Sequence, residues 1–413
     1  MSGTSRRQNA RRLLCVYQHA PTRDAPGFYR HRHYFSELVR RGWEVDVVST
    51  PVDYLTGTFP AGYAKRLFTH EEIDGIEHHW AWAASGIHRS RAHRAANYAS
   101  FAAMSAFRGV TLRRPDLVWA SSPPLPVGAV GEVLARRFGV PWIFEIRDLW
   151  PESAASIGWL QQESMLYRTL EWLSHRAASR ANCVVVPTPG LERDAYAHGA
   201  KTVHVVPGIV LDANAEAARP QVRESLGVAP DTCLLAYVGA LGIANGLDVV
   251  LDAAKLVLPD PRIAFLLVGD GSDRARLEQR VAGERISNVT MLGAVPKSQV
   301  PELLAASDVC LHVLRPDPIF EGAQPTKVLE YFGAHRPFIT TVDGVPRALA
   351  DASGGSFAPT AEALAAESKR WAGLSAVERA PLNEQAFRYG MSRFGLEASV
   401  DRLERLLVSL IDV

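Results

Sequence analysis

Lys327 and Glu330 stand three positions apart in a segment that favours a helix, so both side chains would project from one helical face. A lysine ammonium neutralises phosphate as a point charge, and a carboxylate accepts hydrogen bonds from neighbouring sugar hydroxyls. The pair therefore indicates a nucleoside diphosphate site, with Lys327 on the diphosphate and Glu330 on the ribose. A plain surface ion pair between the two side chains is the alternative.

Glycine turns follow three apolar runs that precede this helix, at Gly239 and Gly242, at Gly269, and at Gly293. Glycine lets the backbone approach phosphate oxygens, and a helix N-terminus adds positive potential. In an open parallel sheet such strand ends meet at one crevice. The alternative is that these glycines serve packing. A dinucleotide site of the NAD type is not favoured, because the turn after Gly269 lacks a third glycine at the required spacing.

A second charged segment runs from Glu145 to Glu152 in the first half of the chain, with the sequence Glu-Ile-Arg-Asp-Leu-Trp-Pro-Glu. It follows an apolar run, so Arg147 and Asp148 are expected at a strand end that faces a ligand. A loop held by its own salt bridges is the alternative.

The elements that position these residues alternate between short apolar strands and helical patterns, which predicts two doubly wound α/β domains with buried parallel sheets and a cleft between them. We expect an N-terminal domain at 1–207, a second domain at 208–390, and a C-terminal helix at 391–413 that packs back on the first. The Pro- and Gly-containing segment 206–230 is expected to be a linker. The predicted strands are 13–18, 45–49, 76–82, 117–120, 142–146, 183–187, 233–238, 263–268, 289–292 and 309–314.

Charge is unevenly spread along this chain of 413 residues and net charge +1. Residues 1–207 hold 25 Lys and Arg against 18 Asp and Glu, and residues 208–413 hold 20 against 26. The segment 78–115 has six arginines and no carboxylate, with Phe101, Met104 and Phe107 at helical spacing. Such a segment suits a peripheral anionic membrane surface, or a domain helix whose apolar stripe lies in the core. No nucleic-acid-binding module is recognisable.

The four cysteines lie singly in apolar runs without metal or redox spacing, which predicts reduced core residues and a cytoplasmic protein. The histidine pairs lack nearby ligands, so no metal site is expected. No apolar run is long enough to span a bilayer, and the Arg-rich start does not resemble a secretory signal.

Taken together, these motifs resemble the family 4 glycosyltransferases of the retaining GT-B superfamily. More closely, the chain is similar to the bacterial fucosamine transferases of surface-polysaccharide assembly. The segments that carry the resemblance are 21–30, 41–45, 121–124, 147–152, 239–246, 269–271, 307–309 and 325–337.

The resemblance implies a cytoplasmic, metal-independent enzyme of the hexosyltransferase type, without a cofactor. Its donor would be a nucleotide sugar, with UDP favoured over other bases and an N-acetylated or deoxy sugar as one form. Its acceptor would be lipid-linked, for example polyprenyl-linked, or otherwise membrane-proximal.

By position, Gly239, Gly242 and Gly269 would flank the diphosphate and the turn after Gly293 would face the base. The catalytic residues would be Lys327, which neutralises the diphosphate, with Arg147 and Asp148 in the first domain. Gly27, Arg30 and Glu152 would bind the acceptor.

One departure concerns the donor sugar. The broader family has a glutamate eight positions before Glu330, where this chain has Gly322 with Glu321 beside it. Sugar contact is therefore expected from Glu321 or from the backbone near Gly322. Three other functions stay open: the same transfer to a soluble small molecule, a nucleotide-sugar epimerase, and a non-catalytic GT-B partner subunit.

Overall fold

The computed structural model describes residues 10–23, 30–54, 56–60, 62–63, 66–156, 160–322 and 325–412, so the predicted acceptor residue Gly27 lies outside it. The chain divides into two compact units, which are taken one at a time. The first unit holds residues 1–207 with 399–413, and the second holds residues 208–398.

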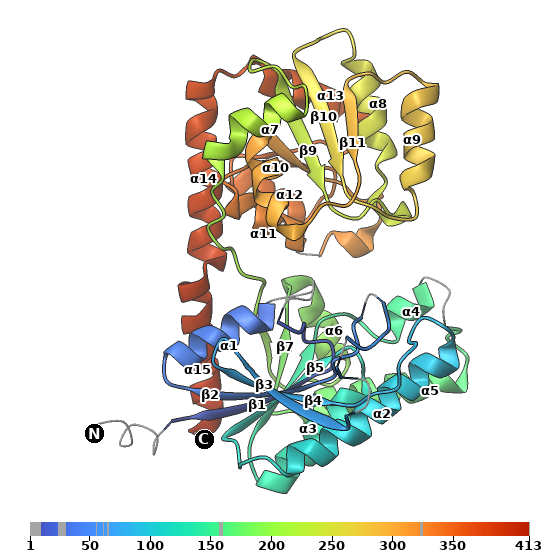
Figure 1. Ribbon diagram of the computed structural model, residues 1–413, viewed down its shortest axis with the longest axis vertical. Helices are drawn as coiled ribbons and strands as arrows, with labels where there is room; N and C mark the ends of the chain where they lie inside the picture. The colour runs from blue at the N-terminus through green and yellow to red at the C-terminus, as the bar shows by residue number, and fades with distance from the viewer. Residues whose placement is uncertain are drawn as a thin grey trace. The chain divides into compact units, whose positions relative to one another are not determined.

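The first unit is built on an eight-stranded sheet in the order β3-β4-β2-β1-β5-β6-β7-β8 (Figure 1). All neighbouring strands are parallel except β3, which forms an antiparallel hairpin with β4 at the sheet edge. The sequence pattern missed β3 and the short β8. The strands are β1 (Arg12–Tyr17), β2 (Glu44–Ser49), β3 (Phe68–Ile73), β4 (Ile76–Ala81), β5 (Leu117–Ser122), β6 (Trp142–Ile146), β7 (Cys183–Val186) and β8 (Val203–Val205).

Helices cover both faces of this sheet, so its central strands are buried and mainly apolar. One face carries α2, α3 and α5, whose buried residues join those of β1, β5 and β6 in one core. Helix α1 lies on the opposite face with Tyr34, Phe35 and Leu38 buried. The helices are α1 (Arg30–Arg40), α2 (Arg91–Val110), α3 (Pro126–Phe138), α4 (Glu152–Ser156), α5 (Met165–Arg180) and α6 (Glu192–Ala197).

The second unit holds a six-stranded, fully parallel sheet in the order β11-β10-β9-β12-β13-β14. Predicted strands 233–238, 263–268 and 289–292 are confirmed residue for residue. The strands are β9 (Cys233–Val238), β10 (Ile263–Val268), β11 (Val289–Leu292), β12 (Val309–His312), β13 (Phe338–Thr340) and β14 (Ser356–Phe357).

The helices of this unit again cover both faces of the sheet. Helices α8 and α13 enclose one core with β9 and β10, and α10, α11 and α14 enclose the other. The helices are α7 (Arg219–Ser225), α8 (Asp248–Leu256), α9 (Arg274–Gly283), α10 (Val300–Ala306), α11 (Thr326–Gly333), α12 (Val345–Ala352), α13 (Ala361–Gly373) and α14 (Ala376–Phe394).

The predicted linker 206–230 is wrong over its second half, where α7 forms. The reason is a buried ion cluster that the local composition could not reveal. Arg219 and Arg223 on α7 reach the carboxylate of Asp308 at 2.6 and 3.3 Å, and Arg379 on α14 reaches it at 2.6 Å. The cluster anchors α7 to the second unit.

The C-terminal boundaries also differ from the prediction. Position 390 falls inside α14, and the expected single helix at 391–413 is interrupted at Gly395. Helix α15 (Leu396–Ile411) follows, with Val400, Leu403 and Leu407 buried. Within the first unit, Glu404 of α15 accepts a hydrogen bond from the Trp43 indole at 2.8 Å.

Candidate functional site

The carboxyl edge of the second sheet is built from glycine turns that lie against one another. The Gly269 N–H donates to the carbonyls of Leu292 and Gly293 at 3.2 Å, and the Gly239 N–H donates to Val268 at 2.9 Å. A Cβ at Gly269 would lie 1.9 Å from the Gly239 carbonyl oxygen, so only glycine fits there. The structure thus brings Gly239, Gly269 and Gly293 to one edge, as predicted.

Lys327 lies at the start of α11 and reaches this edge. Its Nζ donates to the Tyr237 hydroxyl at 2.8 Å and stands 4.0 Å from the centre of the Tyr237 ring. A Cβ at Gly239 would lie 2.9 Å from the same nitrogen, so the glycine makes room for the ammonium. Burial lowers the pKa of Lys327 to about 8. Among the described residues no carboxylate lies within ion-pair distance of this Nζ.

Glu330 follows one turn later but does not bond to Lys327. Its carboxylate pairs with Lys297, which begins the short 3₁₀ turn Lys297–Gln299 after β11. The side chain is 40% exposed, so a ligand can reach it. The alternative of an ion pair between Lys327 and Glu330 is therefore wrong, and a ribose on Glu330 would have to displace or share Lys297.

His312 was missed in the sequence, although it ends an otherwise apolar strand. Its side chain is buried, with Nδ1 2.9 Å from the Thr340 hydroxyl at the end of β13. Nε2 is buried and has no partner among the described residues. Burial and the charge of Lys327 lower the pKa of His312 to about 3, so the ring is neutral. A neutral imidazole thus stands near the ammonium at the same edge.

The remaining predicted donor residues lie around this edge. Gly242 begins the turn Ile243–Asn245 before α8, and the Arg315 N–H donates to Ala244 in that turn at 3.0 Å. Glu321 accepts a hydrogen bond on its carbonyl from Val345 at 2.7 Å, which places it at the start of α12. Its side chain is exposed, and Gly322 beside it is half-buried.

The carboxyl edge of the first sheet is dominated by a buried carboxylate, Glu145 of β6. It accepts hydrogen bonds from Arg30, from His31 at 2.6 Å and from the Trp119 indole at 3.0 Å. Burial acts to raise the pKa of Glu145, but the fields of His31 and Arg30 outweigh it and hold that pKa well below its usual range. Arg30 also donates to the carbonyls of Val206 and Pro207.

Arg30, predicted to bind the acceptor, is thus occupied within the fold. Glu152, also predicted to bind the acceptor, accepts from His198 at 3.0 Å. Asp148 is exposed and accepts from the Ser153 hydroxyl at 2.7 Å. Asp148 is therefore the predicted carboxylate of this edge that solvent reaches most freely.

Arg147 has only neutral partners in the described chain. Its Nη2 donates to the Pro123 carbonyl at 2.7 Å, and its guanidinium lies 4.7 Å from the centre of the Tyr17 ring. Its Nε is buried without a partner, as are the hydroxyls of Tyr17, Ser121 and Ser122. These atoms gather where β1, β5 and β6 end, and buried polar atoms without partners call for an explanation such as a ligand or ordered water.

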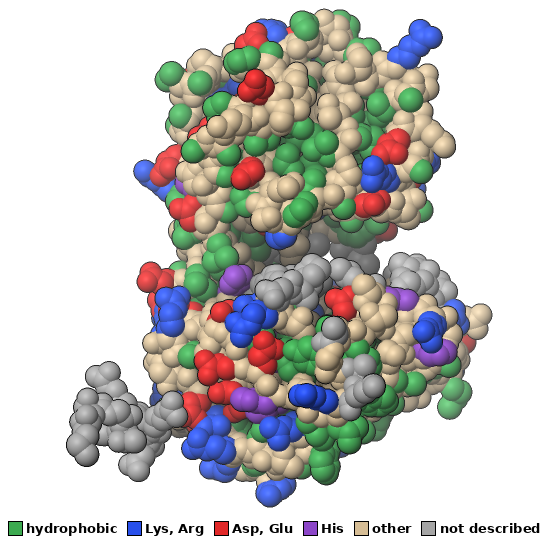
Figure 2. Space-filling model, in the orientation of Figure 1, with side chains coloured by type: hydrophobic (Ala, Val, Ile, Leu, Met, Phe, Trp, Pro, Cys, Tyr) green, Lys and Arg blue, Asp and Glu red, His purple; other side chains and the backbone are tan. Residues whose placement is uncertain are grey.

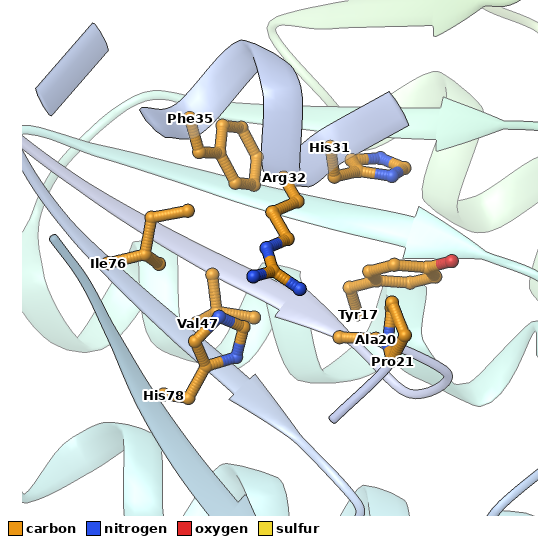
Figure 3. Close-up of a pocket in the computed structure, with 9 residues that line it drawn as sticks. All are labelled: Tyr17, Ala20, Pro21, His31, Arg32, Phe35, Val47, Ile76 and His78. Carbon is orange, nitrogen blue, oxygen red and sulfur yellow. The ribbon is translucent and has the colours of Figure 1, made fainter. Parts of the chain in front are cut away.

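A small cavity lies deeper in the first unit, between α1 and the strands β1, β2 and β4 (Figure 3). Its volume of about 10 Å³ has room for about one water molecule and not for a sugar. Both ring nitrogens of His78, which lines it, are buried without partners. We assign no substrate to this cavity.

Three further findings concern metal ions, membrane spans and cysteines. Within the described ranges, no group of three His, Cys, Asp or Glu side chains is arranged to hold a metal ion. No helix in that part of the chain has the length and apolar composition to cross a membrane. The four cysteines are buried and free.

Two family models match the chain and together cover about three quarters of it. Residues 29–208 match the glycosyl transferase 4-like domain, and residues 232–372 match glycosyl transferases group 1.

Two curated proteins are similar over 239 residues each. The probable glycosyltransferase WbjE of Pseudomonas aeruginosa is 24% identical, over 56% of this chain and 58% of that protein. The putative teichuronic acid biosynthesis glycosyltransferase TuaC of Bacillus subtilis is 30% identical, over 56% of this chain and 54% of that protein. The chain spans about half the length of the curated relatives it matches.

Among solved structures, Anabaena HepE in complex with UDP and glucose superposes with a TM-score of 0.68. The match covers 97% of this chain and 100% of that chain at 17% identity. At this identity the likeness shows the fold alone.

Proposed function

This chain belongs to the family 4 glycosyltransferases of the GT-B fold, and we propose that it transfers a sugar from a nucleotide donor to an acceptor hydroxyl with retention of configuration. The observation that carries the proposal is the ammonium of Lys327. It stands beside the glycine turns of the second sheet, and no carboxylate of the described residues pairs with it. A diphosphate in that position would supply the missing anion.

In this proposal the donor lies on the second unit. Lys327 and the backbone at Gly239 and Gly269 face the diphosphate, Glu330 holds the ribose, and the turn after Gly293 faces the base. Glu321 or the backbone at Gly322 contacts the sugar. UDP is the favoured nucleotide because HepE, of the same fold, was solved with UDP. An N-acetylated or deoxy sugar is the favoured transferred sugar, since the chain resembles fucosamine transferases.

The proposed reaction is a front-face substitution. The bond from the sugar C1 to the diphosphate oxygen breaks, and the acceptor oxygen bonds to C1 from the same face. The acceptor proton passes to the leaving diphosphate. The main contribution of the protein is electrostatic stabilisation of charge on that group, by Lys327 and the backbone N–H groups. Arg147 and Asp148 orient the acceptor and the transferred sugar. The reaction needs no metal ion or cofactor.

We propose a lipid-linked or membrane-proximal acceptor in glycoconjugate assembly. The similarity to TuaC, a putative teichuronic acid biosynthesis glycosyltransferase, supports a polysaccharide product. The arginine-rich segment 78–115 supports contact with an anionic membrane surface. A soluble small-molecule acceptor would call for the same donor site without that contact.

The test is nucleotide binding followed by transfer. Calorimetry with UDP, GDP, TDP and ADP is expected to show one preferred nucleotide, with binding weakened by Lys327→Ala and Glu330→Ala. Lys369→Ala, an exposed lysine on α13, is the matched control. Glu330→Ala removes the proposed ribose contact and also frees Lys297 from its ion pair. Lys297→Ala breaks the same ion pair but keeps Glu330, so comparing the two variants separates these effects. No binding by any nucleotide would overturn the donor-site assignment, and binding without transfer would favour a non-catalytic partner subunit.

A further inference from the structure

Helices α2, α3 and α5 form one layer over one face of the first sheet, with α3 packed against both neighbours (Figure 1). The outer surface of this layer holds most of the exposed large apolar side chains found among the described residues of the unit. These exposed side chains are Phe107 of α2, Val133 of α3, and Met165, Leu166 and Trp172 of α5. Trp172 is 58% exposed and Met165 76%, so neither serves the core.

The three apolar residues at helical spacing on α2, for which the sequence left a membrane surface or the core open, do not share one environment. Phe101 is fully buried in the core, Met104 is half-buried and Phe107 is exposed. The outward face carries exposed alanines and Phe107, which stacks on Phe68 with ring centres 5.8 Å apart. The exposed alanines are Ala92, Ala95, Ala96, Ala99 and Ala103. The face that water meets is therefore apolar from one end of α2 nearly to the other.

The charges around this surface are mainly positive. The three helices contain eight arginines against Glu132 and Glu171. Glu132 is buried and paired with Arg136 and Arg176 at 2.7 and 3.0 Å, so it adds no exposed negative charge. Figure 2 shows basic and hydrophobic side chains interspersed on the visible part of this region. Five of the arginines are exposed, and one of them, Arg136, is paired with Glu132; the other four are Arg91, Arg137, Arg168 and Arg180.

The sign of the charge selects the occupant. A second copy of this chain would bring the same arginines against each other, and like charges oppose such pairing. An anionic bilayer attracts them, while Trp, Met and Phe side chains enter the interface between headgroups and acyl chains. Arginine combined with exposed aromatic and aliphatic residues is the composition of a surface that lies on a membrane.

We propose that the outer surface of the α2–α3–α5 layer docks the first unit on an anionic lipid bilayer. This inference rests on the proposed function. Docking on the bilayer would bring the enzyme to a lipid-linked acceptor. Vesicle binding itself requires neither nucleotide nor transfer.

The test is flotation of the full chain with vesicles, without nucleotide. Binding is expected to vesicles that contain phosphatidylglycerol and not to pure phosphatidylcholine vesicles. Each arginine removed is expected to lower partitioning about fivefold. The variant with Arg91, Arg137, Arg168 and Arg180 all changed to Gln should therefore lose flotation. Trp172→Ser with Met165→Ser should weaken it without changing the charge.

The matched control changes four exposed arginines of the second unit to Gln, namely Arg285, Arg347, Arg388 and Arg393. It should float like the wild type. Equal loss in both variants, or no flotation of the wild type, overturns the proposal. If the protein does not float but forms a dimer in light scattering, and Trp172→Ser abolishes that dimer, the occupant of this surface is a second copy of the chain instead. Circular dichroism checks that each variant is folded, and UDP calorimetry reports on the donor site separately.

Discussion

The proposed donor site predicts that the affinity for UDP falls as pH rises through about 8, because the ammonium of Lys327 would bind the diphosphate. Burial lowers the pKa of Lys327 to about 8 from the ordinary 10.5. Only the protonated lysine stabilises the bound anion, and the anion in turn raises the lysine pKa. Binding therefore takes up a proton above pH 8, and the apparent Kd grows as the free protein loses that proton.

The magnitude follows from the protonated fraction. With a pKa near 8, about ten elevenths of the lysine is charged at pH 7 and about one eleventh at pH 9, so the apparent Kd rises about tenfold. A lysine with an ordinary pKa would stay charged over this range and leave the Kd almost unchanged. Losing the charge altogether removes a charge-assisted hydrogen bond worth about 1.5–3 kcal/mol.

Calorimetry at pH 7, 8 and 9 and constant ionic strength measures this effect. Lys327→Arg keeps its charge over the whole range and should bind UDP with little pH dependence. Lys327→Met should bind weakly at every pH and reports any titration of UDP itself. The assignment of Lys327 to the diphosphate would be refuted if the Kd of the wild type did not change with pH. It would also be refuted if the Kd of Lys327→Met changed with pH as steeply as that of the wild type.

Three further outcomes are expected. His312→Leu removes a buried Nε2 that has no partner among the described residues but also the hydrogen bond to the Thr340 hydroxyl, so these opposing effects should leave the free energy of unfolding in urea within about 1 kcal/mol of the wild-type value; a loss of several kcal/mol would contradict this balance. Glu145→Ala should destabilise by about 3–5 kcal/mol in urea; this loss applies above the unfolded pKa and shrinks as pH falls through the lower folded pKa. Gly269→Ala should destabilise by about 1–3 kcal/mol or more because its Cβ meets a carbonyl, whereas Gly283→Ala, with open space around it, should not.

Three strands of the second unit, β9, β10 and β11, were readable because each is a mainly apolar run followed directly by glycine. Strand β9 illustrates this, since Cys233–Val238 is wholly buried and Gly239 ends it. Strand β3 was missed because Phe68–Ile73 is an antiparallel edge strand with polar, partly exposed residues. Helix α7 was missed because the arginines that fix it reach Asp308, about 85 positions further along the chain.

The arrangement of the carboxyl edge was easier to predict for the second sheet than for the first, for a physical reason. Gly239, Gly269 and Lys327 owe their positions to local rules, namely a strand end and a helix start. Arg30 and Glu152 looked free in the sequence, but their partners lie far away in it. Glu145 is 115 positions from Arg30, and His198 is 46 from Glu152. Pairing across such separations depends on the sheet order, which the pattern of one chain does not encode residue by residue.

The pairing of charges in the fold points to anionic ligands independently of the family. A buried or half-buried cation without a partner costs free energy, and folded chains normally pair it. Arg30 pairs with Glu145, Arg223 with Asp308, and Arg336 with Glu216. Among the described residues, Lys327 and Arg147 are cations at the end of a parallel sheet whose hydrogen-bond partners are neutral groups.

Each of these two cations lies at the carboxyl edge of a parallel sheet, which is where open α/β sheets bind their ligands. A donor diphosphate would pair with Lys327, and an anionic or strongly polar acceptor group would pair with Arg147. A reaction whose leaving group gains negative charge gives both cations a use, whereas a fold serving only as a scaffold would gain stability by pairing or replacing them.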